Sequence, residues 1–375
     1  MRSWMCALIL SLGLWMAVDA QGPKKESTET VARPRKKAGG DAPAVEAEAP
    51  KVPSKLMKKE KALPDGVATF RSDSTTVSVD VAVLDNRGNF IPKIPGGNFR
   101  VLEDNVPQKL QTFGVGEANM TVALVVEFSN LFQRYWSEPW YQTLTATYGF
   151  VQTLKKEDYV AVIAYDLRPE ILSDFTTDRQ LTQEALQRLR IAAYSESNLF
   201  DALVDTSERM SEIEGRKAIV LISSGVDTFS RLTFDKTRKS LQNAGVPIYA
   251  LGLMQSLREY LDARGAMGAI QRLDFLQADN NLRTFAKETG GMAFFPRFYG
   301  EFPNIFRAIH DSLRNQYVVT YNPTNQTRDG KFRKIKVELV NPATNEPLKI
   351  TDEKGKPIKY SVIAKAGYTA PREVE

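Results

Sequence analysis

Cysteine and histidine carry much of the covalent and metal chemistry of proteins, and each occurs once in this chain. They are represented by Cys6, which lies in a leading apolar segment, and by His310. Catalytic triads, zinc sites and most general-base mechanisms need an imidazole or a thiolate beside the reacting group. We therefore expect a protein that is not an enzyme. A serine-dependent hydrolase with a lysine or aspartate base is the remaining catalytic alternative.

The leading segment has the features of a secretory signal. Arg2 precedes an apolar stretch from Met5 to Val18, and Val18-Asp19-Ala20 resembles a signal cleavage site. The stretch is short for a membrane span, and no later stretch is apolar enough to be one. The sequence predicts a signal peptide over residues 1–20 and a secreted or periplasmic protein. A retained membrane anchor is the alternative.

The net charge of +5 is concentrated in residues 21–63, where eleven basic residues stand against six acidic ones. The rest of the chain is close to neutral and lacks the basic surface typical of nucleic-acid binding. Residues 21–63 are rich in Pro, Ala, Lys, Glu and Gly, so they cannot bury enough apolar surface to fold. We interpret them as a disordered tether. A basic patch that binds an anionic surface is the alternative.

Apolar and polar residues alternate near both ends of the remaining chain, which is typical of half-buried antiparallel strands. Val77, Val79, Val81 and Val83 share one face of the first such strand. Similar segments are 99–105, 109–113, 317–321 and 335–339. We expect residues 66–116 and 317–371 to form the two parts of a small β-sandwich.

The middle of the chain carries continuous apolar runs, which predict strands buried on both faces of a parallel sheet. These runs are 121–126, 159–165, 218–223 and 246–253. They are separated or followed by segments with helical spacing, namely 140–154, 181–189, 199–213, 234–244 and 302–313. This alternation predicts an α/β domain over residues 120–316, a doubly wound, mostly parallel sheet inserted in the sandwich. The long connection over 255–280 is a helical insertion or part of a partner surface.

Ligands of open α/β sheets bind at the carboxyl ends of the strands. The loops expected there are 128–132, 195–198 and 224–229. An aromatic group either anchors a partner if exposed or covers a helix if buried; its members are Phe132, Tyr135, Trp136, Trp140 and Tyr141. No phosphate-binding glycine motif follows a strand, which argues against a nucleotide site.

Several local phrases and their order resemble the von Willebrand factor type A-related proteins of bacteria, of the Acidobacteria type. The resemblance covers about residues 75–371. The phrases are Asn98-Phe99-Arg100-Val101-Leu102-Glu103-Asp104-Asn105, Ala123–Glu127, Leu199-Phe200-Asp201-Ala202-Leu203, Val220-Leu221-Ile222-Ser223-Ser224-Gly225-Val226-Asp227, Asp329-Gly330-Lys331-Phe332-Arg333-Lys334-Ile335 and Ala366-Gly367-Tyr368-Thr369-Ala370-Pro371.

That family carries a metal-ion-dependent adhesion site, formed by an Asp-x-Ser-x-Ser loop, a Thr before the third helix and an Asp after the fourth strand. The resemblance places Glu127, Ser129 and Leu131 on the loop positions. It places Ser197 on the Thr position and Ser224 on the Asp position. The implied site therefore keeps one carboxylate and three hydroxyls.

Mg²⁺ prefers about six oxygen ligands and carboxylates that offset its charge. We expect a degenerate site with no cofactor, or with weak Mg²⁺ or Mn²⁺ binding, to which Glu196 or Asp227 could restore a carboxylate. Alternatively, the three serines satisfy backbone groups at strand ends.

The resemblance implies a protein that binds or adheres to a protein or surface polymer through the rim of its sheet. The residues expected on this rim are Phe128, Asn130, Leu131, Phe132, Glu196 and Asn198. The alternative is a structural scaffold or assembly factor of the cell envelope that has no metal-dependent ligand. His310 lies beside the apolar stripe of a helix, and we interpret it as a helix-surface residue.

Overall fold

The computed structural model describes residues 76–372, except 87, 116–118, 190–193, 214, 267 and 352–353. The predicted signal peptide and tether lie outside the described residues. Residues 71–375 cluster as one compact unit. The part of the chain that is described contains no helix that is both long and apolar enough to cross a membrane.

A six-stranded sheet forms the centre of the α/β region, in the order β10-β9-β8-β5-β6-β7. All neighbours are parallel except β6 and β7. The strands are β5 (Met120–Glu127), β6 (Tyr159–Tyr165), β7 (Pro169–Thr176), β8 (Arg216–Ser223), β9 (Ile248–Gly252) and β10 (Ala293–Phe294). Every residue of β5 is buried, as the apolar run predicted. The antiparallel strand β7 was not predicted, because its half-exposed sequence has no continuous apolar run.

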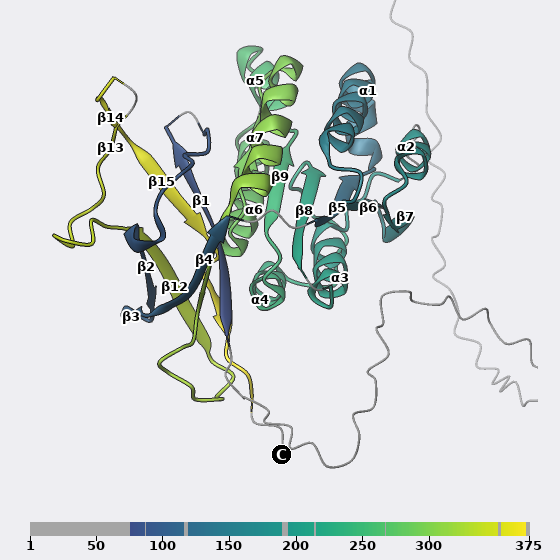
Figure 1. Cartoon of the computed structure of the whole chain (residues 1–375). Coiled ribbons are helices and arrows are strands. Elements are labelled where there is room, and N and C mark those ends of the chain that lie inside the picture. Colours follow the sequence, from purple (N-terminus) through teal and green to yellow (C-terminus); the bar gives the residue numbers. More distant parts are fainter. Residues whose placement is uncertain are drawn as a thin grey trace, which may run out of the picture. The chain divides into compact units, whose positions relative to one another are not determined.

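Helices cover both faces of this sheet (Figure 1). On one face α1 (Asn130–Thr153), α2 (Arg179–Gln187), α5 (Gln255–Ala263) and α7 (Phe302–Asn315) contribute to a core with Leu124 and Val220. On the other face α3 (Leu199–Ser211), α4 (Phe234–Ala244) and Leu282 and Phe285 of α6 (Ala269–Thr289) pack in a core with Val125 and Leu221. The core on each face thus combines alternate residues of the same strands.

One helical prediction needs correction and another is confirmed. The first helix was expected from residue 140, but it begins at Asn130, because its first turns lack a regular apolar stripe in the sequence. The connection over 255–280 is almost entirely helical, formed by α5 and the first half of α6, so the helical interpretation of that segment is confirmed.

Two four-stranded sheets are built from the segments before and after the α/β region. One has the order β15-β1-β11-β4 and the other β16-β12-β2-β3. Their strands are β1 (Val77–Asp85), β2 (Phe99–Glu103), β3 (Val106–Gln108), β4 (Leu110–Val115), β11 (Tyr317–Tyr321), β12 (Phe332–Leu339), β15 (Tyr360–Ala364) and β16 (Gly367–Thr369). A short hairpin of β13 (Ile350–Thr351) and β14 (Pro357–Ile358) and two 3₁₀ turns, η1 (Gly96–Asn98) and η2 (Tyr299–Glu301), complete the described elements.

The two four-stranded sheets share one hydrophobic core. Val79 and Val81 of β1 meet Val101 of β2 and Val337 of β12 within it. Each of the two sheets needs strands from before and from after the α/β region. β1 pairs with β11 and β15, and β2 pairs with β12. Antiparallel strands with alternating burial therefore flank the α/β region in sequence, as the pattern predicted.

Candidate functional site

The loop that follows β5 begins with a buried carboxyl group. Glu127 ends the strand, Phe128 N–H donates to Tyr165 O at 2.8 Å, and Ser129 occupies the N-cap position of α1. The Ser129 hydroxyl makes no capping hydrogen bond. It donates instead to Glu127 Oε1 at 2.9 Å. The local turn thus directs a hydroxyl inward onto the carboxylate.

Four further groups donate hydrogen bonds to Glu127 from neighbouring strands. Ser224 N–H lies 2.7 Å from Oε2, and Ser224 Oγ lies 2.8 Å from the same oxygen. Ser223 Oγ is 3.1 Å and Tyr165 OH 3.2 Å from Oε2. We call Glu127, Ser129, Tyr165, Ser223 and Ser224 the Glu127 cluster. Each of its members is at most 1% exposed, so the carboxylate is satisfied internally and closed to solvent.

Burial sets the electrostatics of this cluster. It raises the pKa of Glu127, and the hydrogen bonds from Ser224, Ser129 and Ser223 oppose that rise. Burial also raises the pKa of Tyr165 well above its usual range, and the nearby Glu127 charge adds to the effect. Tyr165 therefore remains neutral, and its single hydroxyl hydrogen is shared between Glu127 Oε2 and Ser223 Oγ, which lies 2.8 Å from the hydroxyl oxygen.

Ser197, which was expected to join this cluster, hydrogen-bonds elsewhere. Its hydroxyl donates to Val226 O at 2.8 Å, and its carbonyl accepts from Thr228 N–H and Phe229 N–H at 2.9 and 3.0 Å. These bonds fasten the loop before α3 to the loop after β8. Ser197 thus fits the alternative interpretation, in which hydroxyls satisfy backbone groups at strand ends.

The loop after β8 lies directly against α6. Gly225 has a φ of +79°, and a Cβ at this position would come within 2.4 Å of Ala278 O. Only glycine combines this left-handed backbone with such a close approach. The positions of Ser224 and Asp227 on either side of it are therefore set by tight packing.

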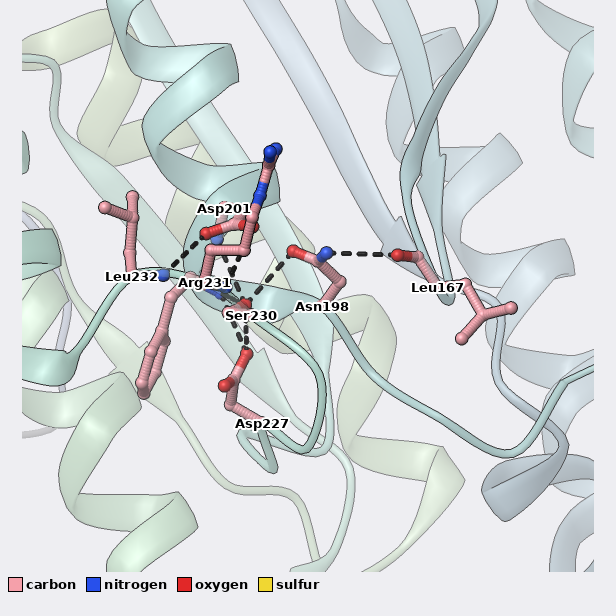
Figure 2. Close-up of polar contacts among 8 residues, drawn as sticks. Leu167, Asn198, Asp201, Asp227, Ser230, Arg231 and Leu232 are labelled. Atoms are coloured by element: carbon pink, nitrogen blue, oxygen red, sulfur yellow. Dashed lines mark hydrogen bonds and ion pairs between the residues drawn. The ribbon is translucent and has the colours of Figure 1, made fainter. Parts of the chain in front are cut away.

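Asp227 belongs to a second set of polar contacts at the start of α3 (Figure 2). Its Oδ1 accepts from Phe200 N–H at 3.1 Å and from Ser230 Oγ at 2.5 Å. Ser230 Oγ also lies 3.1 Å from Asn198 Oδ1, and Asn198 Nδ2 donates to Leu167 O at 3.0 Å. Asp227 thus satisfies a free N–H of the first turn of α3 from outside the helix.

Asp201 anchors the other side of the same loop (Figure 2). Its carboxylate accepts from Arg231 N–H at 3.1 Å and from Leu232 N–H at 3.0 Å. Burial acts to raise the pKa of Asp201, but these two N–H groups and the Arg231 side chain outweigh it and lower the pKa. For Asp227, burial outweighs the hydrogen bonds from Ser230 and Phe200, so its pKa is raised.

The expected rim residues lie in different surroundings. Phe128 is half-buried with its ring 6.1 Å from the Trp140 ring, and Asn198 is buried. Glu196 is exposed and its Oε2 accepts from Ser195 N–H at 3.1 Å. The three remaining rim residues form the first turn of α1, and their side chains lie outside the described set; they are Asn130, Leu131 and Phe132.

The two members of the aromatic group after β5 whose side chains are described differ in exposure. Trp140 is buried and donates from Nε1 to Leu189 O at 2.8 Å, whereas Tyr141 is 70% exposed. The side chains of the other three members are outside the described residues. Two further aromatics at the rim are exposed, Phe229 in the loop 224–229 at 56% and Tyr194, directly before the loop 195–198, at 51%.

Four polar residues of these networks were missed as site residues. Tyr165 and Ser223 end strands that were predicted, so the position of each at a carboxyl strand end was an available signal. Asp201 is the acidic residue in the first turn of α3. Ser230 had no signal, because only the folded loop brings it to Asp227 and Asn198.

The described residues contain no group of three or more His, Cys, Asp or Glu side chains placed to hold a metal ion. In the Glu127 cluster a single carboxylate faces hydroxyl and N–H donors that all point to it. These donors act as hydrogen-bond partners of the carboxylate.

Residues 123–226 match the family model described as the von Willebrand factor type A domain. This stretch runs from β5 to the loop after β8 and includes the whole Glu127 cluster. The chain thus contains a von Willebrand factor type A-related domain. No curated protein matches the chain.

Several solved structures match the chain at low sequence identity. A von Willebrand factor type A protein from Catenulispora acidiphila has a TM-score of 0.41 and 11% identity, and the match covers 81% of this chain and 76% of that one. The vWF domain of the type V pili tip protein Mfa5 from Porphyromonas gingivalis has a TM-score of 0.40 and 14% identity, and the match covers 53% of this chain and 98% of that one. Proximal thread matrix protein 1 from the mussel byssus has a TM-score of 0.43 and 13% identity. The match covers 56% of this chain and 51% of that one, so it spans about half of that protein. The domain assignment rests on the family match.

Proposed function

We propose that this protein is a secreted or periplasmic binding or adhesion protein that recognises a protein or surface polymer through the rim of its type A-related domain. The observation that carries the proposal is the construction of the rim. The loops containing Tyr194 and Phe229 are tied to each other through Ser197, and both aromatic side chains remain exposed. Exposed aromatic residues are typical anchors of recognition surfaces.

The proposal includes recognition without a divalent cation. Both oxygens of Glu127 already accept hydrogen bonds, and the side chain has no exposed surface. Asp227, the carboxylate that could restore a site, is engaged at the start of α3. Opening the cluster to a small, strongly hydrated ion would break these bonds, so the residues present do not fit Mg²⁺.

The same contacts support a protein without catalytic activity. The hydroxyls of Ser129, Ser223 and Ser224 donate to a buried carboxylate and are closed to a substrate. The sole histidine, His310, lies on α7 with its Nδ1 3.2 Å from Asp311 Oδ1.

We further infer that the α/β domain is inserted in a β-sandwich. The shared core of the two four-stranded sheets and their long-range pairings support this architecture. Cleavage of the signal over 1–20 and a tether over 21–63 remain parts of the proposal.

Capture of partners from solubilised envelope and secreted proteins tests the rim. We expect wild-type protein to retain a defined set of partners in Mg²⁺ and equally in EDTA, and Phe229→Asp to lose it. Leu181→Asp is the matched control, because Leu181 is 48% exposed on α2 outside the rim loops. If Phe229→Asp retains the same set as Leu181→Asp, the rim is not the binding surface, and the envelope-scaffold alternative is favoured.

Calorimetric titration with Mg²⁺ and with Mn²⁺ tests the metal-free part of the proposal. We expect no saturable heat. A saturable binding heat that Glu127→Gln abolishes would contradict it.

A further inference from the structure

A groove separate from the rim lies between the flanking β strands and the helices of the α/β region. Helices α4 and α6 with β10 line one side, and β12, β15 and β16 line the other. Contacts that join the two sides include Ala366 N–H to Glu288 O at 3.0 Å and Thr369 to Asn243. Its volume is about 1880 Å³, larger than the roughly 300–1,000 Å³ of small-molecule pockets. Its size suits a segment of a polymer.

The groove is strongly basic. Its lining includes two acidic residues, Asp104 and Glu288, and seven basic ones, Arg238, Lys239, Arg283, Lys287, Lys334, Lys336 and Arg372. Both acids are already engaged, since Asp104 Oδ1 accepts from the Lys334 N–H at 2.9 Å and Glu288 lies 3.6 Å from Arg238. A ligand in this groove would therefore meet an excess of positive charge. We call this feature the basic groove.

Three ammonium groups of the basic groove are available to a ligand. Lys239, Lys287 and Lys334 are exposed, and none forms an ion pair with another described side chain. They come from α4, α6 and β12, so they face the groove from both sides. Their charge complements a ligand with carboxylates spaced along its length.

Two sheet edges also line the basic groove. β10 is the last strand of the six-stranded sheet, and β15 is the last strand of one four-stranded sheet. Val362 and Ile363 of β15 are lining residues, as are Met292 and Phe294 at β10. A free edge offers backbone donors and acceptors to an extended chain, and the apolar lining offers contacts for alternate side chains.

We propose that the basic groove binds an extended acidic peptide segment of a partner protein, which pairs with the edge of β15 and places its carboxylates on Lys239, Lys287 and Lys334. β15 is favoured over β10 because it has five residues and β10 has two. A peptide is favoured over an anionic polysaccharide because only a peptide backbone satisfies a strand edge. This surface acts independently of the rim.

Fluorescence anisotropy on the full chain tests the proposal, with a fluorescein-labelled ten-residue peptide in which Glu alternates with Val and Thr. The groove variant carries Lys239→Glu, Lys287→Glu and Lys334→Glu. The control carries Lys109→Glu, Lys155→Glu and Lys156→Glu, which are exposed residues away from the groove and from β15, with the same charge change. We expect Kd to rise about tenfold or more in the groove variant and less than about twofold in the control.

A second arm needs no variant of the protein. The same peptide with every backbone nitrogen methylated has no N–H to donate to β15, so we expect its binding to the wild type to weaken about tenfold. Polygalacturonate, which has carboxylates but no peptide backbone, should compete poorly. Equal losses in the two triple variants, equal affinity for the methylated peptide, or stronger binding of polygalacturonate than of the peptide would each overturn the proposal.

Discussion

Two buried glutamates, one in each region of the molecule, are held by hydroxyl groups in different ways. Glu127, in the α/β region, accepts from several hydroxyls and from the Ser224 N–H, and both of its oxygens are engaged. Glu103, in the core of the flanking sheets, is 2% exposed and accepts from Tyr321 OH at 2.7 Å and Tyr368 OH at 3.1 Å. Both bonds to Glu103 reach its Oε2, and Glu103 Oε1 has no hydrogen-bond partner among the described residues.

Both glutamates end a strand, so the difference lies in what surrounds each strand end. Glu127 stands where β5 ends, so it meets free backbone N–H groups and the serines of adjacent loops. Glu103 ends β2 in a layer whose backbone groups are committed to sheet pairing, so only long side chains reach it. A buried carboxylate at a strand end can thus be satisfied by quite different sets of donors.

Removing the carboxyl group of Glu127 should give the largest effect. Glu127→Ala leaves the Ser224 N–H and at least two hydroxyls buried without an acceptor, which we expect to lower the free energy of unfolding by about 3 kcal/mol or more. Urea denaturation of the wild type and of Glu127→Ala measures this loss in the free energy of unfolding. A loss below about 1 kcal/mol would show that the cluster relaxes freely or admits water.

Amide substitutions compare the two glutamates at constant shape. Glu127→Gln turns an NH₂ group toward donors on either oxygen, so we expect a loss of about 2 kcal/mol. Glu103→Gln can direct its NH₂ to the side of the unpartnered Oε1, so about 1 kcal/mol or less is expected. The same denaturation experiment serves both variants, and a larger loss for Glu103→Gln would reverse the comparison.

Tyrosine hydroxyls offer a finer test. Tyr321→Phe removes one of two donors to Glu103 and should cost about 1.5 kcal/mol. Tyr165→Phe leaves Glu127 with donors from Ser129, Ser223 and Ser224, so it should cost about 0.5–1 kcal/mol. Thermal unfolding of both variants gives the comparison. Equal losses would mean that the number of remaining donors does not matter.

The pH dependence of stability should show the smallest effect. Because the pKa of Glu127 is raised above its ordinary value of 4.5, the folded state binds the proton more tightly than the unfolded state. The contribution of Glu127 to stability is therefore fully present below pH 4.5 and declines as the pH rises through the raised pKa. Unfolding of wild type and Glu127→Gln across this range measures it, and a difference that grows with rising pH would contradict the assignment.

The sequence by itself determined the main periodicities. Continuous apolar runs gave β5, β6, β8 and β9, because a strand covered by helices on both faces has no polar positions. Alternating valines gave β1 and its buried face. The short strand β7 and the start of α1 escaped prediction because neither carries a regular apolar pattern.

The tertiary structure alone decided what the polar residues do. The hydroxyls of Ser129 and Ser224 lie beside Glu127 and donate to its carboxylate. Ser197 and Asp227 bond instead to a neighbouring loop and to α3. The basic groove likewise has no signature in the sequence. Its lysines lie on elements far apart in the chain, and only the packing of α4 and α6 beside β12 brings them together. Periodicity records which face of an element is buried, but hydrogen-bond direction and charge clustering depend on how the elements are placed in space.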